Sequence, residues 1–218
     1  MRLAIFAPIF VFAVIAVGLA YVAIYEKPPV PGRLLPKTPK TITIGVGELT
    51  DALTNGPWVS PGLPGKAIYS IGFRTCPDCV NFKRTEFADY HKSNIDTRVI
   101  IYARRGNADA AEQAIVADIA CTRNWSIFER WMEDVPEAYG EIYGLPPAAN
   151  SDKRRAACLE WGRVVRERVA SVVKKNGWPM ETPAMFWRAK NGDWRMFLGD
   201  DKRGKRLIRK ELGVPQAH

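Results

Sequence analysis

Hydrophobic and polar positions divide the chain into an apolar N-terminal run, a proline-rich stretch and a longer region of alternating strand and helix patterns. Residues 3–25 contain no charged side chain. A helix of that length, rising about 1.5 Å per residue, crosses a bilayer core of about 30 Å. The run is also longer than the apolar core of about 7–15 residues that is usual in signal peptides. We therefore expect residues 1–25 to be a transmembrane anchor. A cleaved signal peptide is the alternative, because small residues lie near the end of the run.

Residues 26–65 combine prolines with short apolar patterns. Pro28, Pro29 and Pro31 favour extended conformations and a semi-rigid spacer. Polar and apolar residues alternate over 41–46, which indicates a short strand, and a helical turn is expected at 48–53. We interpret 26–65 as a proline-rich linker with short N-terminal elements, and we place the start of the main domain at residue 66.

Residues 66–218 carry the pattern of an α/β domain. Apolar runs predict buried strands at 67–74 and 96–102, and helical spacing predicts a helix at 77–92 between them. The later elements are a helix at 109–131, a loop-rich stretch at 134–150, a helix at 152–175, a hairpin of strands 184–188 and 194–198 joined through Asn191-Gly192, and a basic helix at 201–212. The order is β–α–β, a helical insertion over about 109–175, and then β–β–α.

The charge balance narrows the possible partners only slightly. The net charge is +9, and 47% of the residues are hydrophobic, which is sufficient for a core of ordinary size. A basic surface permits contact with anionic lipid or nucleic acid, but it is not specific for either. The sequence contains no run of Lys and Arg interleaved with aromatic residues, so we expect no nucleic-acid partner. We interpret the basic C-terminal helix as a solvated face.

The most informative motif is Cys76-Pro77-Asp78-Cys79, at the junction between a predicted strand and a predicted helix. The free N–H groups and the dipole of a helix N-terminus favour a thiolate and lower the pKa of a thiol there. Two cysteines three residues apart can also form a disulfide with each other. A zinc site is the alternative, but zinc needs about four ligands, and no second Cys-x-x-Cys or histidine pair is present. We therefore predict a redox pair, with no metal and no cofactor.

Two motifs together resemble the thioredoxin superfamily. The first is the stretch 73–79, which ends in the Cys-x-x-Cys, and the second is Thr182-Pro183-Ala184 about 100 residues later. The resemblance covers roughly residues 66–212 and is strongest to the bacterial periplasmic disulfide-bond proteins. It implies a thioredoxin-like fold with a helical insertion, preceded here by the expected transmembrane helix. It also implies a cis-proline beside the cysteines, where Thr182 and Pro183 bind an extended substrate strand.

The same resemblance implies thiol–disulfide exchange with exported proteins. Cys76, the more exposed cysteine, would react with the substrate, and Cys79 would resolve the mixed disulfide. Asp78 disfavours a neighbouring thiolate, and Arg74 could offset that effect. The dipeptide Pro-Asp between the cysteines matches no pair typical of the family's oxidases or isomerases, so the direction of the reaction stays open. A non-catalytic binding module of an envelope assembly is the alternative function.

Two further cysteines, Cys121 and Cys158, fall on separate predicted helices of the insertion. We predict a structural disulfide between them, worth about 3–4 kcal/mol by the loop-entropy relation. Two buried free cysteines packing as small hydrophobic residues are the alternative.

Histidines and tryptophans add little to this picture. We expect His91 and His218 to be surface residues without a role. Trp178 and Trp187 flank the Thr-Pro dipeptide and could line a substrate groove.

The expected location is the inner membrane, with a single pass and the catalytic domain in the periplasm. Lys and Arg are more frequent after the apolar run than before it, which by itself favours a cytoplasmic domain. The short N-terminal flank and the four cysteines favour the oxidising side. The expected partners are proteins with thiols or disulfides and a membrane redox partner. A cytoplasm-facing reductase is the alternative.

Overall fold

The computed structural model describes residues 36–106, 108, 110–133 and 152–216. The compact unit to which they belong begins at Leu35. The expected anchor over residues 1–25 and the loop-rich stretch at 134–150 lie outside the described residues. Within the part of the chain that is described, no helix combines the length and apolar character needed to cross a membrane.

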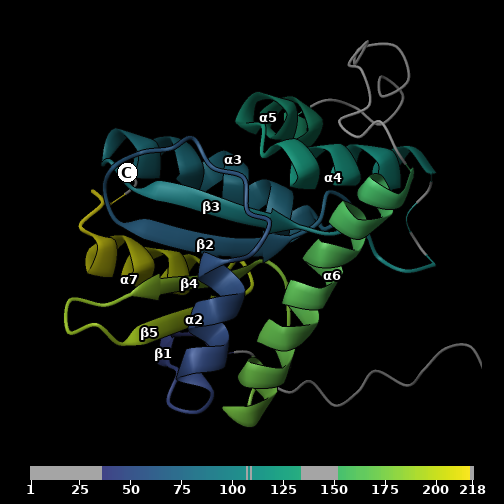
Figure 1. The fold of residues 1–218 in the computed structure, drawn as a ribbon. Coiled ribbons are helices and arrows are strands. Elements are labelled where there is room, and N and C mark those ends of the chain that lie inside the picture. Colours follow the sequence, from purple (N-terminus) through teal and green to yellow (C-terminus); the bar gives the residue numbers. More distant parts are fainter. Residues whose placement is uncertain (1–35, 107, 109, 134–151, 217–218) are drawn as a thin grey trace, which may run out of the picture. The chain divides into compact units, whose positions relative to one another are not determined.

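A five-stranded sheet lies at the centre of this unit, with the strand order β1-β5-β4-β2-β3 (Figure 1). The strands are β1 (Lys40–Thr41), β2 (Ala67–Gly72), β3 (Asp96–Ile101), β4 (Ala184–Arg188) and β5 (Trp194–Leu198). β2 and β3 are parallel, whereas the β2–β4, β4–β5 and β5–β1 pairs are antiparallel. The loops that follow β2 and β3 and the loop that precedes β4 therefore meet at one edge of the sheet.

Helices cover both faces of the sheet (Figure 1). One face packs against α3 (Pro77–Lys92), α4 (Ala110–Thr122), α5 (Trp125–Glu133) and α7 (Lys202–Leu212). The other face packs against α2 (Val46–Thr54) and α6 (Asp152–Lys175). Alternation along each strand separates the two cores, because successive side chains point to opposite faces. In β2, for example, Ile68 belongs to the α3 side, and Tyr69 and Ile71 belong to the α2–α6 side.

The described part of the expected linker belongs to the globular unit. Leu49 and Leu53 of α2 are fully buried. Val59 exchanges two backbone hydrogen bonds with Val99 of β3, at 2.9 and 2.8 Å, and so satisfies part of that edge strand. The compact unit therefore begins well before residue 66, because short apolar segments between prolines still find a sheet to pack against. The observed strand in this region is the two-residue β1 at Lys40–Thr41, not the expected 41–46.

The first helix of the insertion differs from the prediction. A continuous helix at 109–131 was expected, but α4 ends at Thr122 and α5 begins at Trp125. Arg123 between them has a φ of 55°, a left-handed conformation that no α-helix continues through. Apolar spacing alone did not reveal this corner. The second helix, α6, has the predicted bounds Asp152–Lys175.

A buried ion pair attaches α3 to α7. Arg209 Nε donates to Glu86 Oε2 at 2.7 Å, and Arg209 Nη2 donates to Asp89 Oδ2 at 3.0 Å. Glu86 is 3% exposed and Arg209 is 2% exposed. Removing one partner of such a pair leaves an uncompensated buried charge, so the pair holds α3 firmly in place. The N-terminus of that helix carries the cysteine motif.

Candidate active site

Cys76 is the N-cap residue of α3. Its backbone is extended, at φ −96° and ψ 108°, and its Sγ accepts a hydrogen bond from the Cys79 N–H at 3.2 Å. Pro77 occupies the first turn, where a missing N–H costs nothing because that donor has no partner inside the helix. The sulfur therefore occupies the position that a capping oxygen takes in other helices, and a negative charge is favoured there.

Cys79 lies one turn further along, against the end of β2. A Cβ on Gly72 would come within 2.9 Å of Cys79 Sγ, closer than real Cβ contacts allow. Glycine at this position is what lets the second cysteine pack against the strand. Cys76 and Cys79 form no disulfide in this structure, and each exposes only 7% of its surface. Cys76 was expected to be the more exposed of the two, but the exposed fractions of the two residues are equal.

The segment before β4 brings a third group to the sulfur. The peptide bond between Thr182 and Pro183 is cis. Thr182 Oγ1 donates to Cys76 Sγ at 3.6 Å, and the Thr182 carbonyl oxygen lies at the same distance from that sulfur. The structure thus brings together Cys76, Cys79, Thr182 and Pro183, the residues that the sequence assigned to exchange and to substrate binding.

Hydrogen bonds, rather than exposure, distinguish the two thiols. The hydrogen bond from the Cys79 side chain lowers the pKa of Cys76 from 9.0 to about 6, with burial opposing it and Thr182 and the Cys79 N–H assisting. The same bond, together with burial, raises the pKa of Cys79 well above its ordinary value. Cys76 is therefore mostly thiolate at neutral pH, and Cys79 holds the shared proton.

Asp78 and Arg74 do not oppose each other at Cys76 as expected. The carboxylate of Asp78 opposes ionisation of Cys76, but it is the smallest of the causes that shift this pKa. Arg74, expected to offset Asp78, donates through Nε to the carbonyl of Trp131 in α5 at 2.7 Å. Its guanidinium thus ties the loop after β2 to the helical insertion.

An aromatic and basic group beside Cys76 was not found from the sequence. Phe73 packs edge-on against Tyr102, with ring centres 5.4 Å apart, and the Arg104 guanidinium lies 4.6 Å from the Phe73 ring centre. The three residues come from the ends of β2 and β3, so only the pairing of these strands places them together. The only hint in the sequence was the pair Arg104-Arg105, which follows the second predicted strand.

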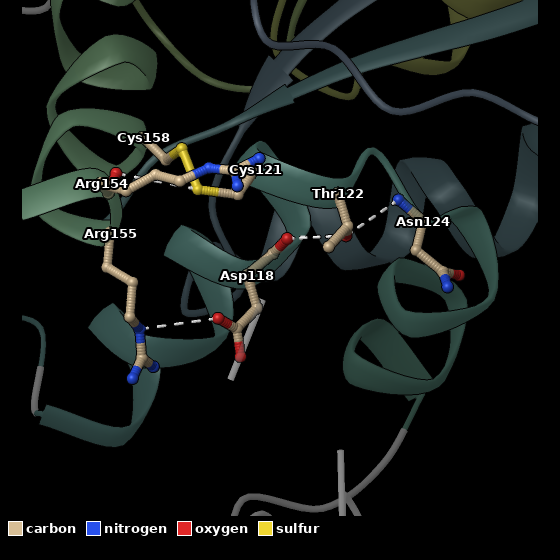
Figure 2. Close-up of a disulfide and its surroundings, with 7 residues drawn as sticks. All are labelled: Asp118, Cys121, Thr122, Asn124, Arg154, Arg155 and Cys158. Atoms are coloured by element: carbon tan, nitrogen blue, oxygen red, sulfur yellow. Dashed lines mark hydrogen bonds and ion pairs between the residues drawn. A yellow bond between two sulfur atoms is a disulfide. The ribbon is translucent and has the colours of Figure 1, made fainter. Parts of the chain in front are cut away.

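Cys121 and Cys158 form a disulfide between α4 and α6, with Cα atoms 5.4 Å apart (Figure 2). Arg155 and Asp118 connect the same two helices through an ion pair of 3.6 Å. Thr122, next to Cys121, donates its hydroxyl to the Asp118 carbonyl at 2.7 Å. These contacts gather at the end of α4, immediately before the corner at Arg123.

Expectations for four other residues need correction or completion. Trp187 is fully buried and donates its indole N–H to Glu211, so it does not line a groove. Trp178 is half-buried, with the Lys40 ammonium 5.5 Å from its ring centre. His91 is not a plain surface residue: its Nε2 lies 2.7 Å from Thr97 Oγ1, and burial lowers its pKa. His218 lies outside the described residues.

His91 also lines a groove between α3 and α5 with a volume of about 360 Å³. Within the described residues, no three side chains of the kinds that bind metals lie together.

Comparison with known proteins locates this fold among solved structures. No protein-family profile and no curated protein matches the sequence. A periplasmic thioredoxin-like protein from Salmonella enterica serovar Typhimurium is similar, with a TM-score of 0.52 and 13% identity over 76% of this chain and 97% of that one. The catalytic domain of Proteus mirabilis ScsC gives a TM-score of 0.54 and 14% identity, over 78% and 97% of the two chains.

The chain has a thioredoxin-like fold. A linker-deletion mutant of Proteus mirabilis ScsC supports the same conclusion, with a TM-score of 0.56 and 14% identity over 98% of this chain and 99% of the mutant. The predicted fold class is thereby confirmed for the described residues. Identities of 13–14% establish the fold and not the activity.

Proposed function

We propose that this thioredoxin-like chain is a thiol–disulfide oxidoreductase that works through Cys76 and Cys79. The observation that carries the proposal is the setting of Cys76 Sγ. It caps a helix N-terminus, it accepts the Cys79 N–H at 3.2 Å, and it lies 3.6 Å from Thr182. Its pKa of about 6 provides a thiolate at neutral pH, the form that attacks disulfides.

In the reducing direction, the Cys76 thiolate attacks one sulfur of a substrate disulfide. A Cys76–substrate S–S bond forms, the substrate bond breaks, and the other substrate sulfur leaves as a thiolate. Cys79 then loses its proton to solvent or to that leaving thiolate, and its sulfur attacks Cys76. The Cys76–Cys79 disulfide forms, and the second substrate thiolate is released. Two electrons pass from the protein to the substrate, and the reverse sequence oxidises the substrate.

Thr182 and Pro183 are proposed to hold the substrate during exchange. Thr182 lies 3.6 Å from Cys76 Sγ, and Pro183 follows it through a cis bond immediately before β4. The backbone of Thr182 can pair with an extended segment of substrate, so that its cysteine is presented to the thiolate. Cys121–Cys158 is proposed as a purely structural disulfide, because it joins two helices of the insertion.

Thiolate stabilisation favours one direction of the reaction. Whatever stabilises the Cys76 thiolate stabilises the reduced pair, and this makes the disulfide of the pair a stronger oxidant. We therefore propose that the protein donates disulfides. Its equilibrium reduction potential tests this: a value near about −120 mV supports an oxidant, and one near about −270 mV supports a reductant.

Exported proteins in the periplasm are the proposed substrates. A periplasmic protein shares the fold, and the apolar run at residues 3–25 is proposed to anchor the chain in the inner membrane near a membrane redox partner. A topology reporter fused after Leu212 tests the orientation, because a cytoplasmic signal would favour the alternative of a cytoplasm-facing reductase.

The exchange activity itself is tested with the full chain in a non-ionic detergent. Insulin serves as the substrate disulfide, with Cys76→Ser and Cys79→Ser as variants. We expect activity in the wild type, none in Cys76→Ser, and a trapped Cys76–substrate disulfide in Cys79→Ser. If the wild type does not exceed the Cys76→Ser background, the enzyme proposal is wrong, and a non-catalytic binding module takes its place.

A further inference from the structure

Cys76 lies between two loops of different charge. In the sheet, β2 has β4 on one side and β3 on the other, and Gly72 at the end of β2 pairs with Ile101 at the end of β3. The loop that carries Cys76 is therefore flanked by the Thr182 segment on the β4 side. On the β3 side it is flanked by the segment that contains Arg104.

Arg104 contacts the cysteine loop directly. Its guanidinium carbon lies 4.6 Å from the ring centre of Phe73, and its Nη2 donates to Thr75 Oγ1 at 3.2 Å. Thr75 is the residue before Cys76. The residue is half-buried and its hydrogen bond to Thr75 is exposed, so the guanidinium is held in place yet accessible to solvent.

Arg166 of α6 adds a second guanidinium on the same side. Its guanidinium carbon lies 5.8 Å from the ring centre of Tyr102, and Tyr102 packs against Phe73. The Nε of Arg166 is buried and has no hydrogen-bond partner in the described part of the chain. The two arginines thus lie against one pair of packed aromatic rings, Phe73 after β2 and Tyr102 after β3.

Several other arginines of the described residues pair with a carboxylate. Arg105 pairs with Glu160, Arg168 with Asp51, and Arg98 with Asp96. Among the residues that the structure describes, neither Arg104 nor Arg166 forms an ion pair. Basic side chains left unpaired at the edge of a reactive site provide charge complementarity for an anionic partner.

The β4 side carries the opposite charge. Glu181 precedes Thr182, is exposed, and forms no ion pair within the described ranges. Asp78 is exposed on the first turn of α3. Acidic side chains thus lie before β4 and on the first turn of α3, whereas Arg104 lies on the side of Cys76 that faces the end of β3.

We propose that Arg104, with Arg166 behind it, selects substrate polypeptides that carry an acidic residue beside the reacting cysteine. The inference rests on the proposed function and names the substrate class for it. A substrate strand that pairs with Thr182 directs its flank across Cys76 toward β3. There a carboxylate on the substrate meets the Arg104 guanidinium, which has no carboxylate of its own. Arg104 is thus a specificity-determining residue.

The test uses peptides that each contain one cysteine in a mixed disulfide with 2-nitro-5-thiobenzoate. The residue before or after the cysteine is Glu, Gln or Lys. The reduced full chain in non-ionic detergent attacks the peptide sulfur, and the released thiolate is followed by its colour. For one of the two flanking positions, we expect the Glu peptide to react about fivefold faster than the Gln peptide, the scale of a partly exposed ion pair. The Lys peptide should be slower than both, and 0.5 M NaCl should compress the differences.

Variants separate charge recognition from loop positioning. Arg104→Gln should remove the preference for Glu, and Arg104→Lys should restore part of it. Arg105→Gln is the matched control. Arg105 is the next residue, and its exposed guanidinium already pairs with Glu160, so this variant should keep the preference for Glu. Thr75→Val removes the hydrogen bond from Arg104 but keeps the charge, so the preference should persist.

Equal rates for all peptides with the wild type would overturn the inference and leave the proposed function intact. An Arg104→Gln variant that slows every peptide by the same factor would also overturn it, because the residue would then only position the loop. Failure of the wild type to react with any peptide would overturn the proposed function, and the inference with it.

Discussion

The two cysteine pairs of this molecule use the same chemistry for different purposes. Cys76 and Cys79 lie on one turn at a helix N-terminus, are not joined by a disulfide, and are hydrogen-bonded to each other. Cys121 and Cys158, at a sequence separation of 37, form a disulfide between two helices. The first pair has a third partner, Thr182, that contacts its sulfur. The second has around it an ion pair and hydrogen bonds that hold helices together.

The comparison shows that the environment of a sulfur decides between reactivity and cross-linking. A thiol that receives N–H and S–H hydrogen bonds becomes a thiolate near neutral pH and can exchange. Two cysteines on facing helices gain nothing from a thiolate, and instead reduce the entropy of the unfolded chain by closing a long loop. Four changes test whether the two pairs are independent in this sense.

The largest effect is expected from Cys76→Ser. Exchange with insulin should fall by about 10³-fold or more, the scale on which loss of a nucleophile lowers enzyme rates. At about pH 5.5, where Cys76 is mostly protonated, the free energy of unfolding in urea should change little, because serine also caps helices well. A variant that keeps most of the activity would contradict the assignment of Cys76 as the reacting sulfur.

Replacing Cys121 and Cys158 together by alanine should have the opposite profile. The free energy of unfolding should fall by about 3–4 kcal/mol through loss of the loop constraint. The exchange rate should stay within about twofold of the wild type, since neither sulfur contacts the Cys76 site. Urea denaturation followed by tryptophan fluorescence, beside the insulin assay, measures both quantities. Loss of exchange in a folded double variant would show that the pairs are coupled.

The free energy of unfolding should depend on pH through the first pair only, when Cys76 and Cys79 are reduced and the Cys121–Cys158 disulfide is intact. Because the pKa of Cys76 is lowered to about 6 from 9.0, its ionisation contributes stability that is fully present above about pH 9. That contribution declines as the pH falls and is lost as it passes through about 6. The Cys121–Cys158 disulfide does not titrate and adds no such slope.

The measurement is the free energy of unfolding of the reduced wild type minus that of reduced Cys76→Ser, between pH 9 and pH 5.5. Thiolate absorbance at 240 nm should show a midpoint near pH 6 in the wild type only. A midpoint above pH 8 would contradict the hydrogen-bonded thiolate.

The smallest effect is expected from Thr182→Val. This change removes the hydroxyl that donates to Cys76 Sγ and keeps a similar shape. The pKa of Cys76 should rise above about 6, and exchange at pH 6 should slow by about two- to threefold, as loss of one weak hydrogen bond predicts. An absorbance midpoint that does not move would show that Thr182 has no part in stabilising the thiolate.

Local elements were largely predictable from the sequence. Helices α3 and α6 and the hairpin strands β4 and β5 have the predicted bounds. Each has a local cause: Pro77 starts α3, Asn191-Gly192 turns the hairpin, and Gly177 with a φ of 88° lies just beyond the end of α6. The corner at Arg123 was missed because nothing in the spacing of apolar residues marks a single left-handed residue.

The candidate site was predictable only in outline. The spacing of Cys76 and Cys79 indicates a redox pair, because residues three apart lie on the same turn of a helix. The stabilisation of the Cys76 thiolate was not predictable in the same way. It depends on Thr182, at a sequence separation of 106, and on how deeply both sulfurs are buried. Trp187, expected beside a groove, is buried instead, because strand alternation directs its side chain into the core against Glu211.

By itself, the sequence determined the order of most elements and the position of the cysteines at a helix N-terminus, because these depend on neighbours a few residues away. Its resemblance to the thioredoxin superfamily implied the fold class. Only the tertiary structure decided the proton partners of Cys76, the place of residues 36–65 in the compact unit, and the meeting of Arg104 with Phe73. These depend on which strands pair. Parallel β2 and β3 with antiparallel β4 bring three distant loops to one edge of the sheet, and pairing across that distance leaves no mark on local spacing.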